Sequence, residues 1–152
     1  MGTFRVTSSS DATEFVAKGA SLSDLFETAA AALFSLVYDR STVGFERELT
    51  VSGETADLES LLAAWLGELW RLYREESFVL GDFIVVEVGA PPSQRYGPPL
   101  MTLRAAVRGR PKGDWFQPFQ AGLHLVTCEV LQLRDHKRSF EATVRVITAN
   151  AS

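Results

Sequence analysis

The chain has 152 residues, of which 46% are hydrophobic and 22% charged, with a formal net charge of −4 and a pI near 5.2. Its length fits one domain over residues 1–152 with a buried core, which excludes a disordered chain, and its single cysteine, Cys128, excludes an internal disulfide. No apolar run approaches the roughly 18–20 residues of a membrane helix, and the negative charge argues against a protein that coats nucleic acid by charge alone.

The first half of the chain predicts two short strands, a helix, a third strand and a second helix. Segments of alternating polarity indicate the strands, and apolar residues at helical spacing indicate the helices. Ser21, with an acid three residues later, is typical of a helix N-cap. The expected elements are strands at 4–6 and 14–17, a helix from Ser21 to Val37, a strand at 45–51, and a helix from Thr55 or Asp57.

The second half of the chain predicts strands only. A buried strand at 83–88 precedes a segment, 89–99, that holds four prolines and two glycines and is expected to be the most mobile loop. Further strands are expected at 101–108, 123–134 and 139–148, the last two joined by a turn. This order predicts the α+β class, with two layers in which two helices pack on one face of a mixed, mostly antiparallel sheet.

The histidines and the cysteine supply no catalytic constellation. His124 and Cys128 share a strand face, but four residues of strand place them roughly 13 Å apart. Ligands of one zinc ion lie about 2.0–2.3 Å from the metal, so this pair cannot hold an ion unaided, nor act as nucleophile and base. We predict no catalytic residues, and a core position for the Cys128 thiol.

A basic stretch with aromatic neighbours follows in the last third of the chain. It comprises Arg104, Arg108, Arg110 and Lys112, followed by Trp115 and Phe116. Cations beside aromatic rings suit contact with RNA phosphates and stacking on bases. A solvated strand end and turn is the simpler interpretation of the same residues, so direct contact with nucleic acid stays open.

The polar segment 8–14, between the first two expected strands, contains the acids Asp11 and Glu14. Carboxylate oxygens are the ligands that hard cations such as calcium and magnesium prefer. A polar turn between two strands has the same composition, and both interpretations remain.

Two longer segments resemble the archease family. Residues 19–30 (GASLSDLFETAA) resemble its first helix, and residues 57–69 (DLESLLAAWLGEL) resemble its second, with a Leu-Leu-x-x-Trp-Leu-x-Glu-Leu core. The similarity covers nearly the whole chain in the same order of elements. It continues in Leu33-Phe34, in Phe78, Asp82 and Phe83, and in the pair Val126-Thr127 of a late strand.

The resemblance implies a small α+β protein that is not itself an enzyme. Archeases act as cofactors of the RNA ligase that joins ends in tRNA splicing and RNA repair, and they help it through its guanylylation step. The family carries a metal ion, often calcium, held by carboxylates from the first hairpin and the C-terminal strand. The resemblance therefore implies an RNA ligase as the partner.

The family's first-hairpin motif, His-Thr-Ala-Asp, falls on the first polar turn of this chain. Without a gap it aligns with Ser9, Ser10, Asp11 and Ala12. Asp11 thus stands one residue before the metal-binding position, and a one-residue bulge could bring it there.

The other family positions also differ. His124 stands where the family has a lysine, and Glu129 where it usually has a histidine. The family has an aspartate around Ile147 or Thr148, whereas the last acid of this chain is Glu141. A site without that carboxylate is expected to bind calcium or another divalent cation weakly, at about millimolar concentrations.

Two functional hypotheses follow. The first is an archease-like cofactor or chaperone of an RNA ligase, with Asp11 as metal ligand and Ser9, Ser10, His124 and Glu129 lining its functional end. The second is an archease-fold binding or assembly module that has lost both the metal site and the RNA-ligase role. A small hydrolase has the least support. We expect a cytoplasmic protein that binds a protein partner and no membrane, in an oligomeric state that the sequence leaves open.

Overall fold

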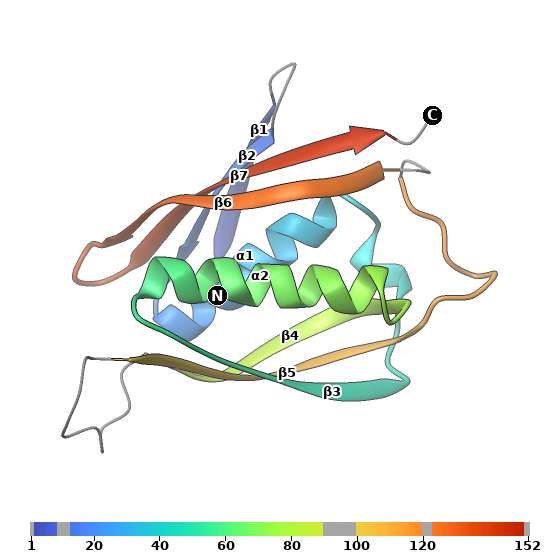
Figure 1. Ribbon diagram of the computed structural model, residues 1–152, viewed down its shortest axis with the longest axis horizontal. Coiled ribbons are helices and arrows are strands. Elements are labelled where there is room, and N and C mark those ends of the chain that lie inside the picture. The colour runs from blue at the N-terminus through green and yellow to red at the C-terminus, as the bar shows by residue number, and fades with distance from the viewer. Residues whose placement is uncertain (1, 9–12, 90–99, 120–122, 151–152) are drawn as a thin grey trace.

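Two helices lie between two antiparallel sheets in the computed structural model of the protein (Figure 1). The structure describes residues 2–8, 13–89, 100–119 and 123–150, and of residues 8, 123–127 and 148–150 it describes the backbone only. The elements in chain order are β1 (Thr3–Ser8), β2 (Thr13–Gly19), α1 (Leu22–Ser35), the 3-10 helix η1 (Arg40–Thr42), β3 (Arg47–Thr55), α2 (Leu58–Arg74), β4 (Phe78–Gly89), β5 (Met101–Pro111), β6 (Leu123–Asp135) and β7 (Phe140–Asn150).

The seven strands form a four-stranded sheet with the order β1-β2-β7-β6 and a three-stranded sheet with the order β3-β5-β4. All strand pairings within the described residues are antiparallel. Register shifts interrupt the β4–β5 pairing and the β6–β7 pairing. Each shift moves the following side chains relative to their partners, so the two faces do not alternate strictly along these strands.

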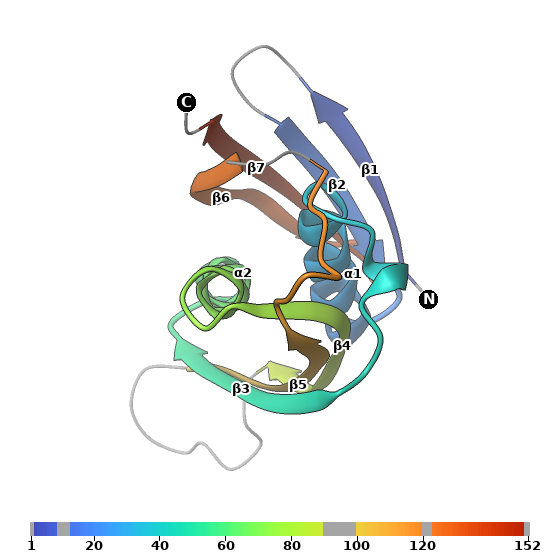
Figure 2. The same cartoon turned by 90° about the vertical axis from the view of Figure 1, so that its right-hand side faces the viewer.

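The sequence predicts the α+β class and two helices on antiparallel strands correctly, but the prediction of one mixed sheet in two layers is wrong about the number of sheets. Figure 2 shows α1 between the two sheets, and it packs on β2 of one and β4 of the other. The reason is that α1 is buried around most of its circumference, and a helix that is apolar all round needs cover on both sides. Its buried residues are Leu25, Phe26, Thr28, Ala29, Ala30, Ala32, Leu33 and Phe34.

Trp65 of α2 joins the two helices. Its ring is fully buried, and its indole Nε1 donates a hydrogen bond of 2.9 Å to the carbonyl oxygen of Phe26 in α1. A buried indole usually finds such an acceptor, because an unpaired N–H in the core is costly. Further along, the ring of Phe34 lies 5.8–6.0 Å, between centroids, from four other rings: Tyr38, Trp70, Tyr73 and Phe83.

Both helices begin where the sequence predicts. The Ser21 hydroxyl accepts a hydrogen bond of 3.1 Å from the backbone N–H of Asp24, whose carboxylate accepts one of 3.0 Å from the N–H of Ala20. Of the two expected starts of α2, the structure selects Asp57, which accepts a hydrogen bond of 2.7 Å from the N–H of Ser60. These side chains satisfy backbone donors that have no partner within the helix.

The strand ends differ from the expected ones. β4 begins at Phe78, well before residue 83, because its first residues are buried and pair with β5. Phe45 lies before β3 and is exposed, not within a strand. The expected turn between β6 and β7 is confirmed, with Lys137 at a φ of 72°. Residues 90–99 of the expected mobile loop lie outside the described residues. No helix of the described ranges is long and apolar enough to cross a membrane.

Candidate functional site

One end of the four-stranded sheet collects the segments that the sequence assigns to the site (Figures 1 and 2). Ser8 and Thr13 are the last pair of the β1–β2 hairpin, and Thr13 lies opposite Val146 of β7. Val146 in turn lies opposite Cys128 of β6. The ends of β1 and β7 and the beginnings of β2 and β6 therefore meet at the same sheet end, as the predicted functional end requires.

The predicted site residues at this end are described to different extents. Ser9, Ser10 and Asp11 lie outside the described residues. The backbone of His124 pairs with that of Ala149 in β7, and its side chain is outside the described part of the chain. The convergence of these segments thus rests on the strand register.

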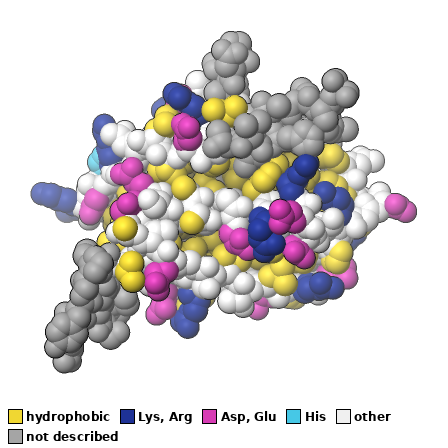
Figure 3. Space-filling view, viewed as in Figure 1, with side chains coloured by type: hydrophobic (Ala, Val, Ile, Leu, Met, Phe, Trp, Pro, Cys, Tyr) yellow, Lys and Arg dark blue, Asp and Glu magenta, His cyan; other side chains and the backbone are white. Residues whose placement is uncertain are grey.

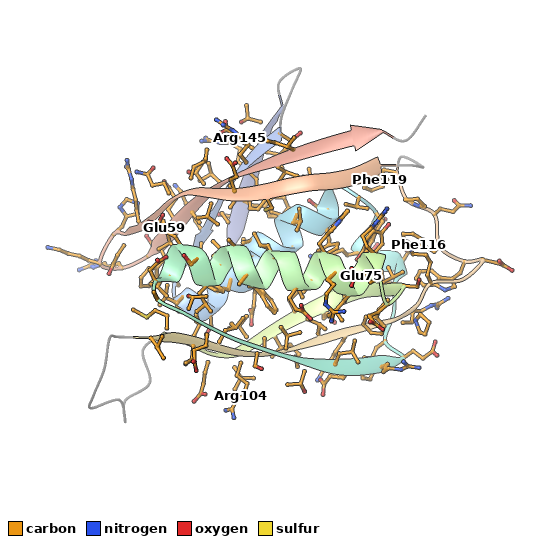
Figure 4. The ribbon with its side chains drawn as sticks, viewed as in Figure 1. Glu59, Glu75, Arg104, Phe116, Phe119 and Arg145 are labelled. Atoms are coloured by element: carbon orange, nitrogen blue, oxygen red, sulfur yellow. The ribbon has the colours of Figure 1, made fainter. Side chains whose placement is uncertain are left out.

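Glu129 is the predicted site residue whose surroundings the structure describes fully. It is exposed and lies directly opposite Arg145 of β7, which lies opposite Glu14 of β2. The Arg145 guanidinium forms an ion pair of 3.7 Å with the Glu14 carboxylate. The side chain of Arg145 projects on the face of the sheet that is turned away from α2 (Figure 4). A cation on β7 thus stands between two carboxylates on neighbouring strands.

Cys128 lies one pair further along the same strands, on the inner side. Its side chain is partly buried and packs against the hydrophobic core, as the sequence predicts. Burial raises the pKa of its thiol to about 12. Because the thiolate is the nucleophile and the metal ligand, this thiol is poorly suited to either role at neutral pH.

The described side chains of this sheet end offer few carboxylates for a calcium ion. Calcium takes about 6–8 oxygen ligands, with affinity set largely by the number of carboxylates. The sequence contains no acid after Glu141, and the carboxylate of Glu14 is already paired with Arg145. Among the described side chains, no group of three or more His, Cys, Asp or Glu residues could hold a metal ion.

The four cations predicted as one basic contact patch differ in their partners. Arg104 and Arg110 are six residues apart in β5, which corresponds to roughly 20 Å. Arg104 pairs with Glu87 of β4 at 3.4 Å, and Arg108 pairs with Glu48 of β3 at 2.9 Å. The charges of both arginines are therefore balanced on the outer face of the three-stranded sheet.

Arg110 and Lys112, in contrast, lie on aromatic rings at the end of β5. The Arg110 guanidinium is 3.7 Å from the ring centroid of Trp115. The Lys112 ammonium lies 4.3 Å from the ring centroid of Tyr73 in α2 and 5.4 Å from that of Phe116. Burial, and to a smaller extent the positive charge of Arg74, lower the pKa of Lys112 below its ordinary value.

Known proteins similar to this chain identify its family. The model of the archease protein family (MTH1598/TM1083) matches residues 9–146. An archease of Methanosarcina mazei is 30% identical over 133 residues, which is 88% of this chain and 87% of the relative. The chain belongs to the archease family. An Archaeoglobus fulgidus archease is 42% identical over 74 residues, 49% of this chain and 53% of the relative.

The archease fold is also found among solved structures. The solution structure of Methanobacterium thermoautotrophicum protein 1598 superposes with a TM-score of 0.76 and 22% identity. The superposition covers 95% of this archease-family chain and 97% of the other chain. At this identity the likeness shows the fold alone, and it agrees with the two helices and antiparallel sheets described above.

Two residues, one near the end of the four-stranded sheet and one near the end of α2, were not predicted as site residues from the sequence. Arg145 and Arg74 both lie in segments predicted correctly as a strand and a helix, but neither was assigned to a site. Their positions depend on which residue of another element lies opposite, and no local motif carries that information. The register shifts in β6 would also have misplaced Arg145 relative to Glu129 in a strict alternating alignment.

Proposed function

We propose that this archease-family protein assists an RNA ligase in tRNA splicing or RNA repair, in the cytoplasm, and is not itself an enzyme. The observation that supports this most directly is the register of the four-stranded sheet. It brings the start of β2 at Thr13, the start of β6 and the end of β7 to one sheet end, in a chain that matches the family over residues 9–146.

The ligase would carry the chemistry, and this chain would supply a shaped, polar surface. Neighbouring strands fix the backbone of Glu129 in register, so this exposed residue has a defined position before the ligase binds. Ser9, Ser10, Asp11, His124 and Glu129 are the residues that we assign to this contact. The raised pKa of the Cys128 thiol supports a role without covalent catalysis.

The proposed role does not depend on a tightly bound metal. Because the donor set lacks a carboxylate after Glu141, we expect calcium or another divalent cation to bind weakly, with Asp11 as its main charged ligand, at about millimolar concentrations. The ion pair of Arg145 with Glu14 places a fixed positive charge close to this sheet end. No step of the proposed assistance passes through a metal ion.

The proposal is tested by mixing the purified chain with the RNA ligase of the same organism. We expect the two proteins to associate, and we expect the ligase to form more joined RNA in the presence of the chain. Glu129→Lys, at the functional end, should weaken both effects. Glu54→Lys, an equally exposed change in β3 of the other sheet, should leave both unchanged. An absence of association together with an unchanged ligation yield would contradict the proposal.

A second candidate is an archease-fold binding or assembly module with no RNA role. The absence of acids after Glu141 and the histidine at position 124 favour it, because both differ from the family pattern while the helix cores are kept. The two candidates predict different results in the ligation assay. A chain that binds a partner other than the ligase, and that leaves ligation unaltered, would support the module.

A further inference from the structure

Cations and aromatic rings gather where α2 and β5 end. We name this surface the basic aromatic corner and define it by Arg74, Arg110, Lys112, Trp115 and Phe116. Arg74 lies in the last turn of α2, and the other four residues follow one another along the end of β5 and the next turn. Figure 4 shows Phe116 at this end of the molecule, beyond the end of α2, and in Figure 3 Lys and Arg side chains lie beside hydrophobic ones near the end of this helix.

The corner is one connected surface. Arg110 stacks on Trp115, whose ring centroid lies 5.7 Å from that of Phe116. Lys112 lies between Phe116 and Tyr73, and its backbone N–H donates a hydrogen bond of 2.7 Å to the carbonyl oxygen of Ser77. The indole of Trp115 donates to the carbonyl oxygen of Pro111 at 3.2 Å. The rings and cations are therefore held in place by the end of β5.

The positive charges of the corner have no carboxylate partners among the described residues. Other basic residues of this chain do have them: Arg71 pairs with three acids of α2 and the segment after it, and Arg104 and Arg108 each pair across strands. Within the described part of the chain, the ion pairs include none with Arg74, Arg110 or Lys112, nor any with Asp114 of the same turn. A protein with a net charge of −4 thus keeps three unbalanced cations together.

An exposed ring extends the corner toward the candidate functional site. Phe119 is 64% exposed, although its backbone N–H is fixed by a hydrogen bond of 2.8 Å to the carbonyl oxygen of Val37. The segment that contains it leads from β5 to the start of β6, along the end of the molecule where β7 also ends (Figure 1). A ligand bound at the corner would therefore lie at the end of the molecule where β6 begins and β7 ends.

We propose that the basic aromatic corner binds single-stranded RNA. Arg110, Lys112 and Arg74 would contact the phosphates, and the exposed ring of Phe119 would stack on a base. Unpaired cations interleaved with exposed rings are the pattern by which proteins hold single strands without reading their sequence. An acidic protein segment would form ion pairs with the cations but would leave the aromatic rings without stacking partners. The choice of RNA over other polyanions rests on the proposed function, whereas the anion-binding chemistry rests on the corner itself.

The cation contribution is measured by the fluorescence anisotropy of a labelled oligouridylate, titrated with the full chain at several salt concentrations. We expect binding that weakens with salt. In the double variant Arg110→Gln with Lys112→Gln, the slope of log affinity against log salt should fall by about 1.4, since each phosphate contact on a single strand contributes about 0.7. Arg104→Gln is the matched control, because it removes a cation of the same strand that is already paired with Glu87.

The ring contribution is measured with Phe119→Ala. Loss of one stacked base should weaken RNA binding by about fivefold or more. Phe4→Ala, which removes a ring that is 40% exposed in β1 of the other sheet, should leave RNA binding unchanged. The thermal unfolding of each variant shows that it is folded, and we expect little change because both rings are substantially exposed.

Three results would overturn the proposal: no anisotropy change for the wild-type chain at low salt, an equal loss of affinity in Arg104→Gln and in the double variant, or displacement of the RNA by polyglutamate as effectively as by unlabelled RNA. The last result would indicate an acidic protein as the occupant. Because the ligase is absent from these titrations, their failure would leave the proposed function standing. Conversely, RNA binding could hold even if the ligase were not stimulated.

Discussion

The hydroxyl of Tyr38 is hydrogen-bonded to both backbone groups of Leu80. It accepts from the Leu80 N–H at 3.0 Å and donates to the Leu80 carbonyl oxygen at 2.8 Å, in a buried position. β4 is an edge strand, and these backbone groups face away from β5. Tyr38, which follows α1, thus occupies hydrogen-bonding positions that a further strand would otherwise take.

Other side chains protect the same edge. The Arg40 guanidinium donates to the carbonyl oxygen of Gly81 at 2.8 Å, and the Glu27 carboxylate accepts from the N–H of Val85 at 2.8 Å. Side chains from α1 and the segment after it therefore satisfy the free edge of the three-stranded sheet. This arrangement gives backbone groups of Leu80, Gly81 and Val85 the partners that buried backbone groups need.

Tyr38→Phe should destabilise the protein by about 2 kcal/mol, because it leaves a buried N–H and carbonyl of Leu80 without partners. The free energy of unfolding in urea measures the change. Tyr73→Phe is the matched control: the Tyr73 side chain is also buried, and its hydroxyl makes no hydrogen bond within the described residues. Equal stability of Tyr38→Phe and the wild type would contradict the assigned role of the hydroxyl.

Replacement by alanine should have different effects on stability at two strand glycines of the same sheet. At Gly109 of β5 a Cβ would overlap the backbone carbonyl oxygen of Val79, so Gly109→Ala should cost about 3 kcal/mol. At Gly53 of β3 a Cβ would meet only a methyl group of Leu61, at an ordinary contact distance of 3.8 Å. Gly53→Ala should therefore be neutral or slightly stabilising. Urea midpoints of the two variants test the pair, and similar midpoints would be inconsistent with the close approach of β4 to Gly109.

The buried thiol of Cys128 predicts a loss of stability at alkaline pH. Its pKa is raised to about 12 in the folded protein, whereas an unfolded thiol ionises near about 8.5. The protonated thiol therefore contributes its full stabilisation of the folded state below the pKa that it has in the unfolded chain. This contribution is lost as the pH rises toward the pKa that the thiol has in the folded protein. Between pH 8 and pH 10.5 the ionisation of this thiol alone should lower the free energy of unfolding by about 2 kcal/mol.

Cys128→Val tests this prediction, because it removes the titrating group and keeps a small apolar side chain. The variant should lose less stability than the wild type over the same pH interval. The difference between the two pH dependences isolates the thiol from the other alkaline groups, such as Tyr38 and Lys112. Parallel pH dependences would show that Cys128 is not shielded from water.

Much of the fold could be predicted from the sequence because its signals are local. The cap at Ser21, the Leu-Leu-x-x-Trp pattern around Trp65 and the alternation in the last strands each depend on neighbouring residues alone. The number of sheets could not be predicted this way. It depends on whether the two sides of α1 meet the same sheet, which is a question of packing between segments far apart in the chain.

The candidate site could be predicted only as a location. The positions of Asp11, His124 and Glu129 came from similarity to a family, and the register brings the starts of β2 and β6 to one sheet end, whereas Asp11 lies outside the described residues. Arg145 was missed because its partners, Glu14 and Glu129, come from two other strands. That Arg110 and Lys112 form no ion pair within the described residues could not be read from the sequence either, since Arg104 and Arg108 belong to the same stretch and are paired.

Calcium should bind the wild-type chain no more tightly than about millimolar, as judged by calorimetric titration. Thr148→Asp adds a carboxylate near the end of β7, where the resemblance to the family leads us to expect one, and should strengthen calcium binding. Thr50→Asp, on exposed β3, is the control for added charge and should have no effect. Micromolar binding by the wild type would contradict the expectation of weak calcium binding.

The decisive measurement of the proposed assistance is the progress of RNA joining by a limiting amount of the partner ligase. We expect each ligase molecule to join more RNA molecules when this chain is present. We expect Glu129→Lys to reduce this gain and Glu54→Lys to leave it unchanged. Superimposable progress curves with and without the chain, under conditions in which the ligase is active, would contradict it.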